Sequence, residues 1–221
     1  MDPARHITPD VHVGEIAAQL AGATAIFRKH KIDFCCGGNV PLAEAASRKN
    51  IDLDGIMSEL ASLAAERPAA PKDTTDLITH IVSRYHDVHR AELPELIKLS
   101  KRVEAVHRDH TDVPRGLAEI LEGAFDNLLQ HMKKEEMILF PAMQRGMQGL
   151  ACGPIAVMRH EHDEHAQSIK RMQEITNDCR PPAGACRSWQ ALYQGVDKLI
   201  ADLTEHMHLE NNVLFPRFEG R

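Results

Sequence analysis

Two segments of this chain, residues 131–141 and 206–216, carry the same pattern, in which a histidine is followed four residues later by a glutamate. The two copies also match at Met, Leu, Phe and Pro, with an offset of 75 residues. An α-helix has about 3.6 residues per turn, so residues four apart lie on one face. Each copy therefore places an imidazole beside a carboxylate, and both groups bind metal cations. The pairs are His131 with Glu135 and His206 with Glu210.

The helix faces that carry these pairs are otherwise apolar. They include Leu128 and Ile138 in the first copy and Leu203 and Val213 in the second. Such a face packs into a core, where an unpaired charge is costly. A bound cation would offset that cost. We therefore predict that both His-Glu pairs are metal ligands.

A second pattern, His-Asp-x-His, occurs at residues 86–89 and 162–165, about 45 residues before each His-Glu pair. The repeated unit is thus helix, connection, helix. Two such units packed together make a four-helix bundle, an architecture whose core holds metals between facing helices. With His86 and His162 added, four histidines and two glutamates are expected to converge.

Mixed imidazole and carboxylate ligands suit a dinuclear centre of borderline-hard ions better than a thiolate zinc site, and iron is the first choice. Two ions about 3.5 to 4 Å apart can share bridging oxygens and keep positions open for water, oxo or a small gas. A zinc protease is excluded because the chain has no His-Glu-x-x-His motif. Glu136, next to the first bridging candidate, is rotated by about 100° to another face.

Several histidines near these motifs are not assigned as ligands. His89 and His165 could be partners of the ligands, extra ligands or solvent-facing residues. We favour the interpretation that neither has a role in the metal site. His160 and His208 alternate away from the ligand face and are expected at the surface. Glu161 either lines an entrance to the site or is simply solvated.

Length and composition favour an all-α protein with a main bundle and a small additional domain. The chain has 221 residues, of which only 4% are aromatic, and Ala, Leu, Ile and Met favour helices over sheet. A Pro/Ala/charged segment at 66–73 predicts a linker between domains at 1–67 and 75–221. Pro94 should kink its helix unless it is accommodated locally. Helices are expected at 13–29, 42–49, 53–65, 75–100, 115–146, 154–177 and 187–218.

The net charge of −6, from 26 basic and 32 acidic residues, gives no basic footprint for nucleic acid. Neither a signal segment nor a membrane-spanning apolar run is visible, so we expect a cytoplasmic protein. In a reducing compartment the five cysteines should be thiols. Cys152, Cys179 and Cys186 are isolated in sequence and are expected to be incidental.

Cys35 and Cys36 are adjacent, and a disulfide between neighbours is strained, so two thiols are expected. Their pKa would be lowered if Gly37 and Gly38 led into a helix N-terminus. Thiolates bind soft metal ions or nitrosyl iron. A packed turn of buried thiols is the alternative to a role in redox chemistry or iron handover.

These motifs together resemble the hemerythrin-like superfamily, and nearly the whole chain is similar to the repair-of-iron-centres (RIC) family of di-iron proteins, with an ScdA-type N-terminal domain. The segments that carry the resemblance are residues 33–38, 84–87, 131–141, 161–164 and 206–216.

The resemblance implies a non-haem di-iron protein that helps to restore iron–sulfur clusters after nitrosative or oxidative damage. It implies two irons bridged by both glutamates and by an oxo or hydroxo group, damaged iron–sulfur proteins as partners, and a homodimer. Oxygen-carrying hemerythrins use a fuller histidine set, which disfavours an oxygen carrier. The implied ligands are His86, His131, Glu135, His162, His206 and Glu210.

Three functions remain compatible with this ligand set. The protein could supply or handle iron for damaged clusters, reduce nitric oxide as an enzyme, or bind nitric oxide or oxygen without turnover. Cys35 and Cys36 favour the first, because a gas carrier has no need of a dithiol.

Overall fold

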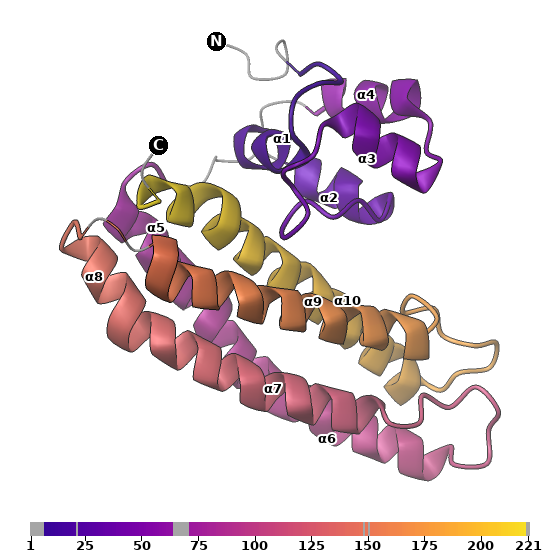
Figure 1. Cartoon of the computed structure of the whole chain (residues 1–221). Helices are drawn as coiled ribbons and strands as arrows, with labels where there is room; N and C mark the ends of the chain where they lie inside the picture. The colour runs from indigo at the N-terminus through magenta and orange to yellow at the C-terminus, as the bar shows by residue number, and fades with distance from the viewer. Residues whose placement is uncertain (1–6, 21, 64–70, 148, 150, 220–221) are drawn as a thin grey trace.

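The computed structural model describes residues 7–20, 22–63, 71–147, 149 and 151–219. Every regular element in these ranges is helical, beside one isolated β-bridge between His12 and Pro41. Figure 1 shows four long helices side by side with a separate group of short helices packed on them. The prediction of an all-α bundle preceded by a small helical domain is thereby confirmed. None of the described helices is long and apolar enough to cross a membrane.

The small domain consists of four short helices around its own apolar core. The single helix expected at 13–29 is wrong, because the chain turns at Gly22, whose φ of 92° is left-handed. Glycine adopts this conformation without steric cost, and the turn lets Leu20 and Ala23 both be buried. The helices are α1 (Val13–Gln19), α2 (Ala23–Lys29), α3 (Leu42–Lys49) and α4 (Leu53–Ala61).

The bundle is formed by α6, α7, α9 and α10, and its helices alternate in direction along the chain (Figure 1). Helix α6 packs against α7 and α10, and α9 packs against the same two neighbours. Pro94 lies inside α6 without ending it. The main helices are α5 (Thr74–Ile81), α6 (Asp87–Val106), α7 (Leu117–Lys134), α8 (Phe140–Gln144), α9 (Ala156–Ile175) and α10 (Arg187–His208). The segments η4 (Ala151–Ile155) and η6 (Phe215–Arg217) are short.

Three of the long helices contain a π-turn at the level of the predicted ligands. These turns are η2 (Val82–His86), η3 (Glu135–Leu139) and η5 (Leu209–Leu214). In both repeats the wide turn closes on the glutamate, because Phe140 N–H donates to the Glu135 carbonyl and Phe215 N–H to the Glu210 carbonyl. A proline follows each phenylalanine and lacks the N–H that an α-helical ladder would need.

The π-turns move the following residues by one position around the helix. The sequence pattern placed Ile138 and Val213 on the inward face, but Ile138 is 61% exposed and Val213 only half-buried. Leu139 and Leu214 take the inward places instead. That part of the prediction was wrong because it assumed uninterrupted α-helical periodicity, and π-turns are frequent at functional sites.

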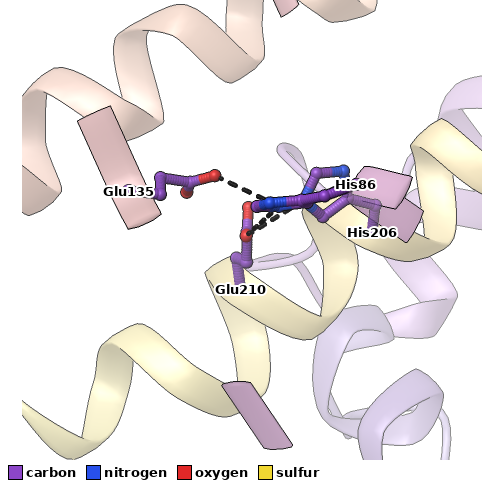
Figure 2. Close-up of side chains that lie close together, drawn as sticks. All are labelled: His86, Glu135, His206 and Glu210. Carbon is purple, nitrogen blue, oxygen red and sulfur yellow. Dashed lines mark hydrogen bonds and ion pairs between the residues drawn. The ribbon is translucent and has the colours of Figure 1, made fainter. Parts of the chain in front are cut away.

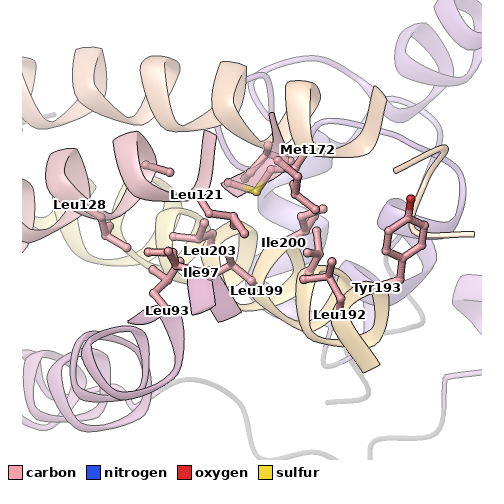
Figure 3. Close-up of a cluster of buried hydrophobic side chains, with 14 of the residues drawn as sticks. Leu93, Ile97, Leu121, Leu128, Met172, Leu192, Tyr193, Leu199, Ile200 and Leu203 are labelled. Atoms are coloured by element: carbon pink, nitrogen blue, oxygen red, sulfur yellow. The ribbon is translucent and has the colours of Figure 1, made fainter. Parts of the chain in front are cut away.

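Two apolar clusters fill the bundle. One contains Leu93, Leu121 and Leu199 and is drawn in Figure 3. The other contains Leu77, Phe140 and Phe215. The six predicted ligands fall between these clusters along each helix, so the polar layer is enclosed by hydrocarbon on both sides.

The small domain packs on the bundle through α1, which contacts η5 and α10. Gly14 N–H donates to the Gly38 carbonyl at 2.9 Å. A β-carbon at Gly38 would lie 2.5 Å from the Phe34 carbonyl oxygen and 2.9 Å from the Gly14 Cα. This contact needs glycine, and it holds the segment that carries Cys35 and Cys36. Residues 66–70 of the linker predicted at 66–73 lie outside the described part, so the domain boundaries remain predictions.

We expect Gly38→Ala to lower the free energy of unfolding by about 1–3 kcal/mol, the usual cost of overpacking. Gly123→Ala is the control, because nothing lies within 4 Å of its added β-carbon. It should raise stability by about 0.5–1 kcal/mol through helix propensity. Chemical denaturation of both variants measures the difference, and equal stabilities would contradict this account of the close approach of Gly38 to Gly14 and Phe34.

Candidate metal centre

All six predicted ligands lie together in the bundle interior, and each is at most 1% exposed. They form two groups in which the ligand atoms are all within 4.8 Å of one another. Both glutamates belong to both groups, as two cations with bridging carboxylates would require. The first group contains His86, His206, Glu135 and Glu210, and the second contains His131, His162, Glu135 and Glu210.

In the first group the Nε2 atoms of His86 and His206 lie 3.0 Å apart. Glu210 Oε1 is 3.0 Å from His206 Nε2, and Glu135 Oε2 is 3.5 Å from His86 Nε2. Figure 2 shows that Glu135 reaches this group from one side, while Glu210 comes from the turn after His206. The four side chains surround a common point.

The second group has nearly the same dimensions. The Nε2 atoms of His131 and His162 are 3.1 Å apart. Glu210 Oε2 is 3.0 Å from His162 Nε2, and Glu135 Oε2 is 3.4 Å from His131 Nε2. The two oxygens of Glu210 thus face different groups, which is the arrangement of a bridging carboxylate.

The hydrogen bonds of the outer imidazole nitrogens show why a cation fits here. His131 Nδ1 donates to Glu161 at 2.8 Å, and His162 Nδ1 donates to the Asn211 side-chain oxygen at 2.9 Å. Each ring therefore carries a proton on Nδ1, and with both rings neutral the Nε2 lone pairs of His131 and His162 would face each other at 3.1 Å. Such lone pairs repel unless a proton or a metal cation lies between them. The two oxygens of the fully buried Glu135 also lack hydrogen-bond partners, so the residues fit bound metal.

The pKa shifts reflect the same crowding of charge. Burial, followed by the neighbouring His206, lowers the pKa of His86 to about 2. Burial lowers the pKa of His131 as well, but Glu135 and Glu161 outweigh it and raise that pKa to about 10. Burial and the charge of Glu210 raise the pKa of Glu135. A bound divalent cation would displace protons from these ligands and compensate the charge of the two carboxylates.

Three residues that accept hydrogen bonds from ligand histidines were not assigned this role from the sequence. Glu136 accepts from His86 Nδ1 at 2.7 Å, and Asn211 and Glu161 serve His162 and His131. Hydrogen bonds from His131 and then Lys134 lower the pKa of Glu161 to about 2 despite its partial burial. The internal repeat gave one indication of this role for two of them, because residues 136 and 211 each directly follow a predicted bridging glutamate.

The structure also places the four histidines that the sequence analysis did not assign as ligands. His160 is exposed, as expected. His208 was expected at the surface but is only 1% exposed, because the small domain covers it: its ring lies 5.4 Å from that of Phe34. His89 and His165 are buried, so neither faces solvent. His165 packs edge-on against His131 at 5.0 Å. Neither His89 nor His165 belongs to the two ligand groups.

The Cys35–Cys36 loop lies against the metal-bearing turn η5. Asn211 Nδ2 donates to the Cys35 carbonyl at 3.1 Å and lies 3.8 Å from Cys36 Sγ. Asn212 Nδ2 contacts the carbonyls of Phe34 and Cys35 at 3.1 and 3.2 Å. Cys35 and His162 are 127 residues apart in the sequence, yet the side chain of Asn211 alone lies between the loop and His162.

The two thiols themselves are free, with Cys35 Sγ and Cys36 Sγ 3.7 Å apart. The expectation of a lowered pKa is not met at Cys35, since the hydrogen bond with Cys36 and burial raise its pKa well above the usual value. No helix starts at Gly37 or Gly38, because α3 begins at Leu42. Cys36 is the more exposed of the two thiols.

Two of the other cysteines are described by the structure. Cys179 and Cys186 are free, and Cys186 is exposed with its Sγ 3.1 Å from His107 Nε2. The side chain of Cys152 lies outside the described part of the structure. Neither Cys179 nor Cys186 belongs to the two ligand groups, and the incidental role of all three cysteines stays a prediction.

A four-helix bundle with two buried histidine and glutamate groups defines a cation-binding helical protein. Residues 77–218 match the hemerythrin HHE cation-binding domain, and residues 9–64 match the ScdA N-terminal domain, described as a domain of unknown function. The chain belongs to the hemerythrin HHE family.

Three relatives of this chain are each named iron-sulfur cluster repair protein YtfE. The protein of Dickeya chrysanthemi is 48% identical over 213 residues, which cover 94% of this chain and 96% of the relative. The protein of Pectobacterium atrosepticum is 46% identical with the same coverage. The protein of Yersinia pseudotuberculosis is 48% identical over 210 residues, covering 93% and 95%. The resemblance to the RIC family is confirmed over most of the chain.

We expect Glu135→Leu and Glu210→Leu each to lose most of the bound metal, because each removes a carboxylate shared by both groups. Glu135→Leu should also raise the Tm of the metal-free protein by several degrees, since it removes a buried carboxylate without hydrogen-bond partners. Glu136→Leu should have an intermediate effect, because it removes the hydrogen-bond partner of His86 and Arg90 but no shared ligand. Metal analysis and thermal unfolding measure these changes.

Glu119→Gln is the control for this series, since Glu119 is exposed on the first turn of α7. Its metal content should equal that of the unmodified protein. Full metal content in Glu135→Leu or Glu210→Leu would contradict the assignment of shared ligands.

Proposed function

We propose that this chain is a di-iron protein that repairs damaged iron–sulfur clusters by holding and supplying iron. The observation that carries the proposal is the position of a dithiol loop directly against the turn that bears Glu210 and Asn211. A buried metal store and a neighbouring thiol pair, of which Cys36 is partly exposed, are the two parts that iron handover needs. The names of the relatives support the same role.

The donor set favours iron as the metal. Four imidazoles and two carboxylates suit borderline ions, whereas soft thiolate ligands are missing from the two groups. Bound iron would supply redox chemistry and a Lewis acid at this position. The six side chains would hold the two ions through Glu135 and Glu210, with His86 and His206 on one and His131 and His162 on the other.

The residues around the ligands would set how firmly each ion is held. Glu136 and Glu161 are carboxylates that accept from ligand histidines, and such partners raise ligand basicity and fix ring orientation. The apolar clusters on both sides exclude water from the layer. How firmly each metal ion is held would therefore depend more on the outer hydrogen bonds of the ligand histidines than on competition from water.

An interdomain groove of about 780 Å³ leads to the loop. It is lined by Lys31 and Cys35 of the small domain and by Lys170, Ile200 and Met207 of α9 and α10. An acceptor segment of a damaged iron–sulfur protein could reach Cys35 through this groove. Such proteins are the proposed partners, and a homodimer remains a prediction.

Reduction of nitric oxide is the second candidate function. Six side chains fall short of the number that two six-coordinate ions accept, so open positions would remain for a small gas. Continuous consumption of nitric oxide with an electron donor would favour this function. Binding in a fixed ratio without turnover would favour a sensing or sequestering role for nitric oxide or oxygen.

We expect the protein purified from iron-replete cells to contain two irons per chain. Metal analysis gives the number, and anomalous scattering gives the positions between the four bundle helices. A single metal per chain, or zinc in four-coordinate geometry, would contradict the di-iron assignment.

Replacing Cys35 and Cys36 together by serine should leave the bundle folded and iron-loaded but lower the rate of cluster repair several-fold. Serine removes soft-metal affinity and thiol chemistry with little change in volume. Cys186→Ser is the control, because Cys186 lies on the loop before α10, away from the Cys35–Cys36 loop. The assay is recovery of activity of a nitric-oxide-damaged iron–sulfur enzyme under anaerobic, reducing conditions. Repair at the unmodified rate by the double variant would contradict a role for the thiols.

A further inference from the structure

One side chain connects the small domain to a predicted metal ligand. Asn211 accepts from His162 Nδ1 through its side-chain oxygen at 2.9 Å, and its side-chain nitrogen donates to the Cys35 carbonyl at 3.1 Å. Asn211 is only 4% exposed. Its amide therefore has few other partners available.

The Cys35 carbonyl fixes which way this amide points. A carbonyl oxygen only accepts, so the amide nitrogen must face it, and the amide oxygen is left for His162. His162 must then carry its proton on Nδ1, which leaves the Nε2 lone pair free for a metal ion. If the loop moved away, the amide could rotate and present its nitrogen to His162. That orientation disfavours the tautomer that binds metal.

The internal repeat shows what is particular to this position. Glu136 occupies the equivalent place in the first repeat and accepts from His86 Nδ1. A carboxylate accepts through both oxygens and cannot donate, so Glu136 needs no second partner to orient it. Asparagine at position 211 makes one ligand histidine dependent on the small domain, whereas Glu136 serves His86 without contact to the Cys35–Cys36 loop.

We propose that Asn211 couples the Cys35–Cys36 loop to His162, so that docking of the small domain determines how firmly the metal between His131 and His162 is held. Asn211 is a positioning residue that acts through His162. The inference deepens the proposed function and rests on it for the identity of the metal as iron. Because coupling is reciprocal, loss of the metal must also loosen the loop.

The coupling is measurable in both directions on the full chain. Alkylation of Cys36 by iodoacetamide should be about fivefold faster in the metal-free protein than in the ferrous-loaded protein, which corresponds to about 1 kcal/mol. In the other direction, Asn212→Ala removes loop contacts that do not involve a ligand. The Asn212→Ala protein should release one of its two irons to a ferrous chelator about fivefold faster than the unmodified protein does.

Asn211→Asp separates coupling from simple damage. Aspartate keeps an acceptor for His162 but cannot donate to the Cys35 carbonyl, so iron release should stay at the unmodified rate while alkylation becomes independent of metal. Adding Asn212→Ala to Asn211→Asp should then not speed iron release further. Glu119→Gln, at an exposed position outside both ligand groups, should leave iron release and the metal dependence of Cys36 alkylation unchanged. Circular dichroism confirms folding of each variant.

Two results would overturn the inference. One is equal alkylation of Cys36 with and without iron in the unmodified protein. The other is an equal effect of Asn212→Ala on iron release in the Asn211 and Asn211→Asp backgrounds, as a purely structural role would give. Coupling without any cluster repair would instead refute only the proposed function, and repair without coupling would refute only this inference.

Discussion

The structure depends on two carboxylates, Glu135 and Glu210, that have no exposed surface in the middle of the bundle. Burial of two like charges so close together is unfavourable without a compensating positive charge. Four imidazoles surround them, and the outer hydrogen bonds leave lone pairs that point inward. Apolar clusters above and below the layer keep water out, so bound cations are the natural partners of this arrangement.

The duplicated helices do not give two equivalent metal positions. The ligands repeat, but the groups behind them differ. Glu136 in one repeat corresponds to Asn211 in the other, and Glu161 corresponds to Tyr85, which stacks on His206 with ring centroids 5.6 Å apart. Each ligand group therefore has one histidine backed by a carboxylate and one that is not. Only the second group is tied to the small domain.

The small domain is part of the site because of this connection. Its contacts with η5 need two glycines in close approach and two asparagines that donate to carbonyls of the cysteine loop. The thiols are thus held beside a metal-bearing turn while Cys36 keeps some exposure. Under the proposed function, the same few hydrogen bonds would link the metal store to the thiols.

The sequence alone determined the all-α class, the duplicated bundle and the six convergent side chains, because a helical period and an exact repeat fix which residues share a face. It did not reveal the π-turns that exchange Ile138 for Leu139 on the inward face, the break at Gly22, or the burial of His208. The periodicity of the sequence does not show where a backbone N–H bonds to the carbonyl five residues before it instead of four. It also does not show which parts of the two domains touch. Only the tertiary structure decided that Asn211 lies between His162 and Cys35, because these residues are far apart in the chain and meet solely through the packing of the small domain on the bundle.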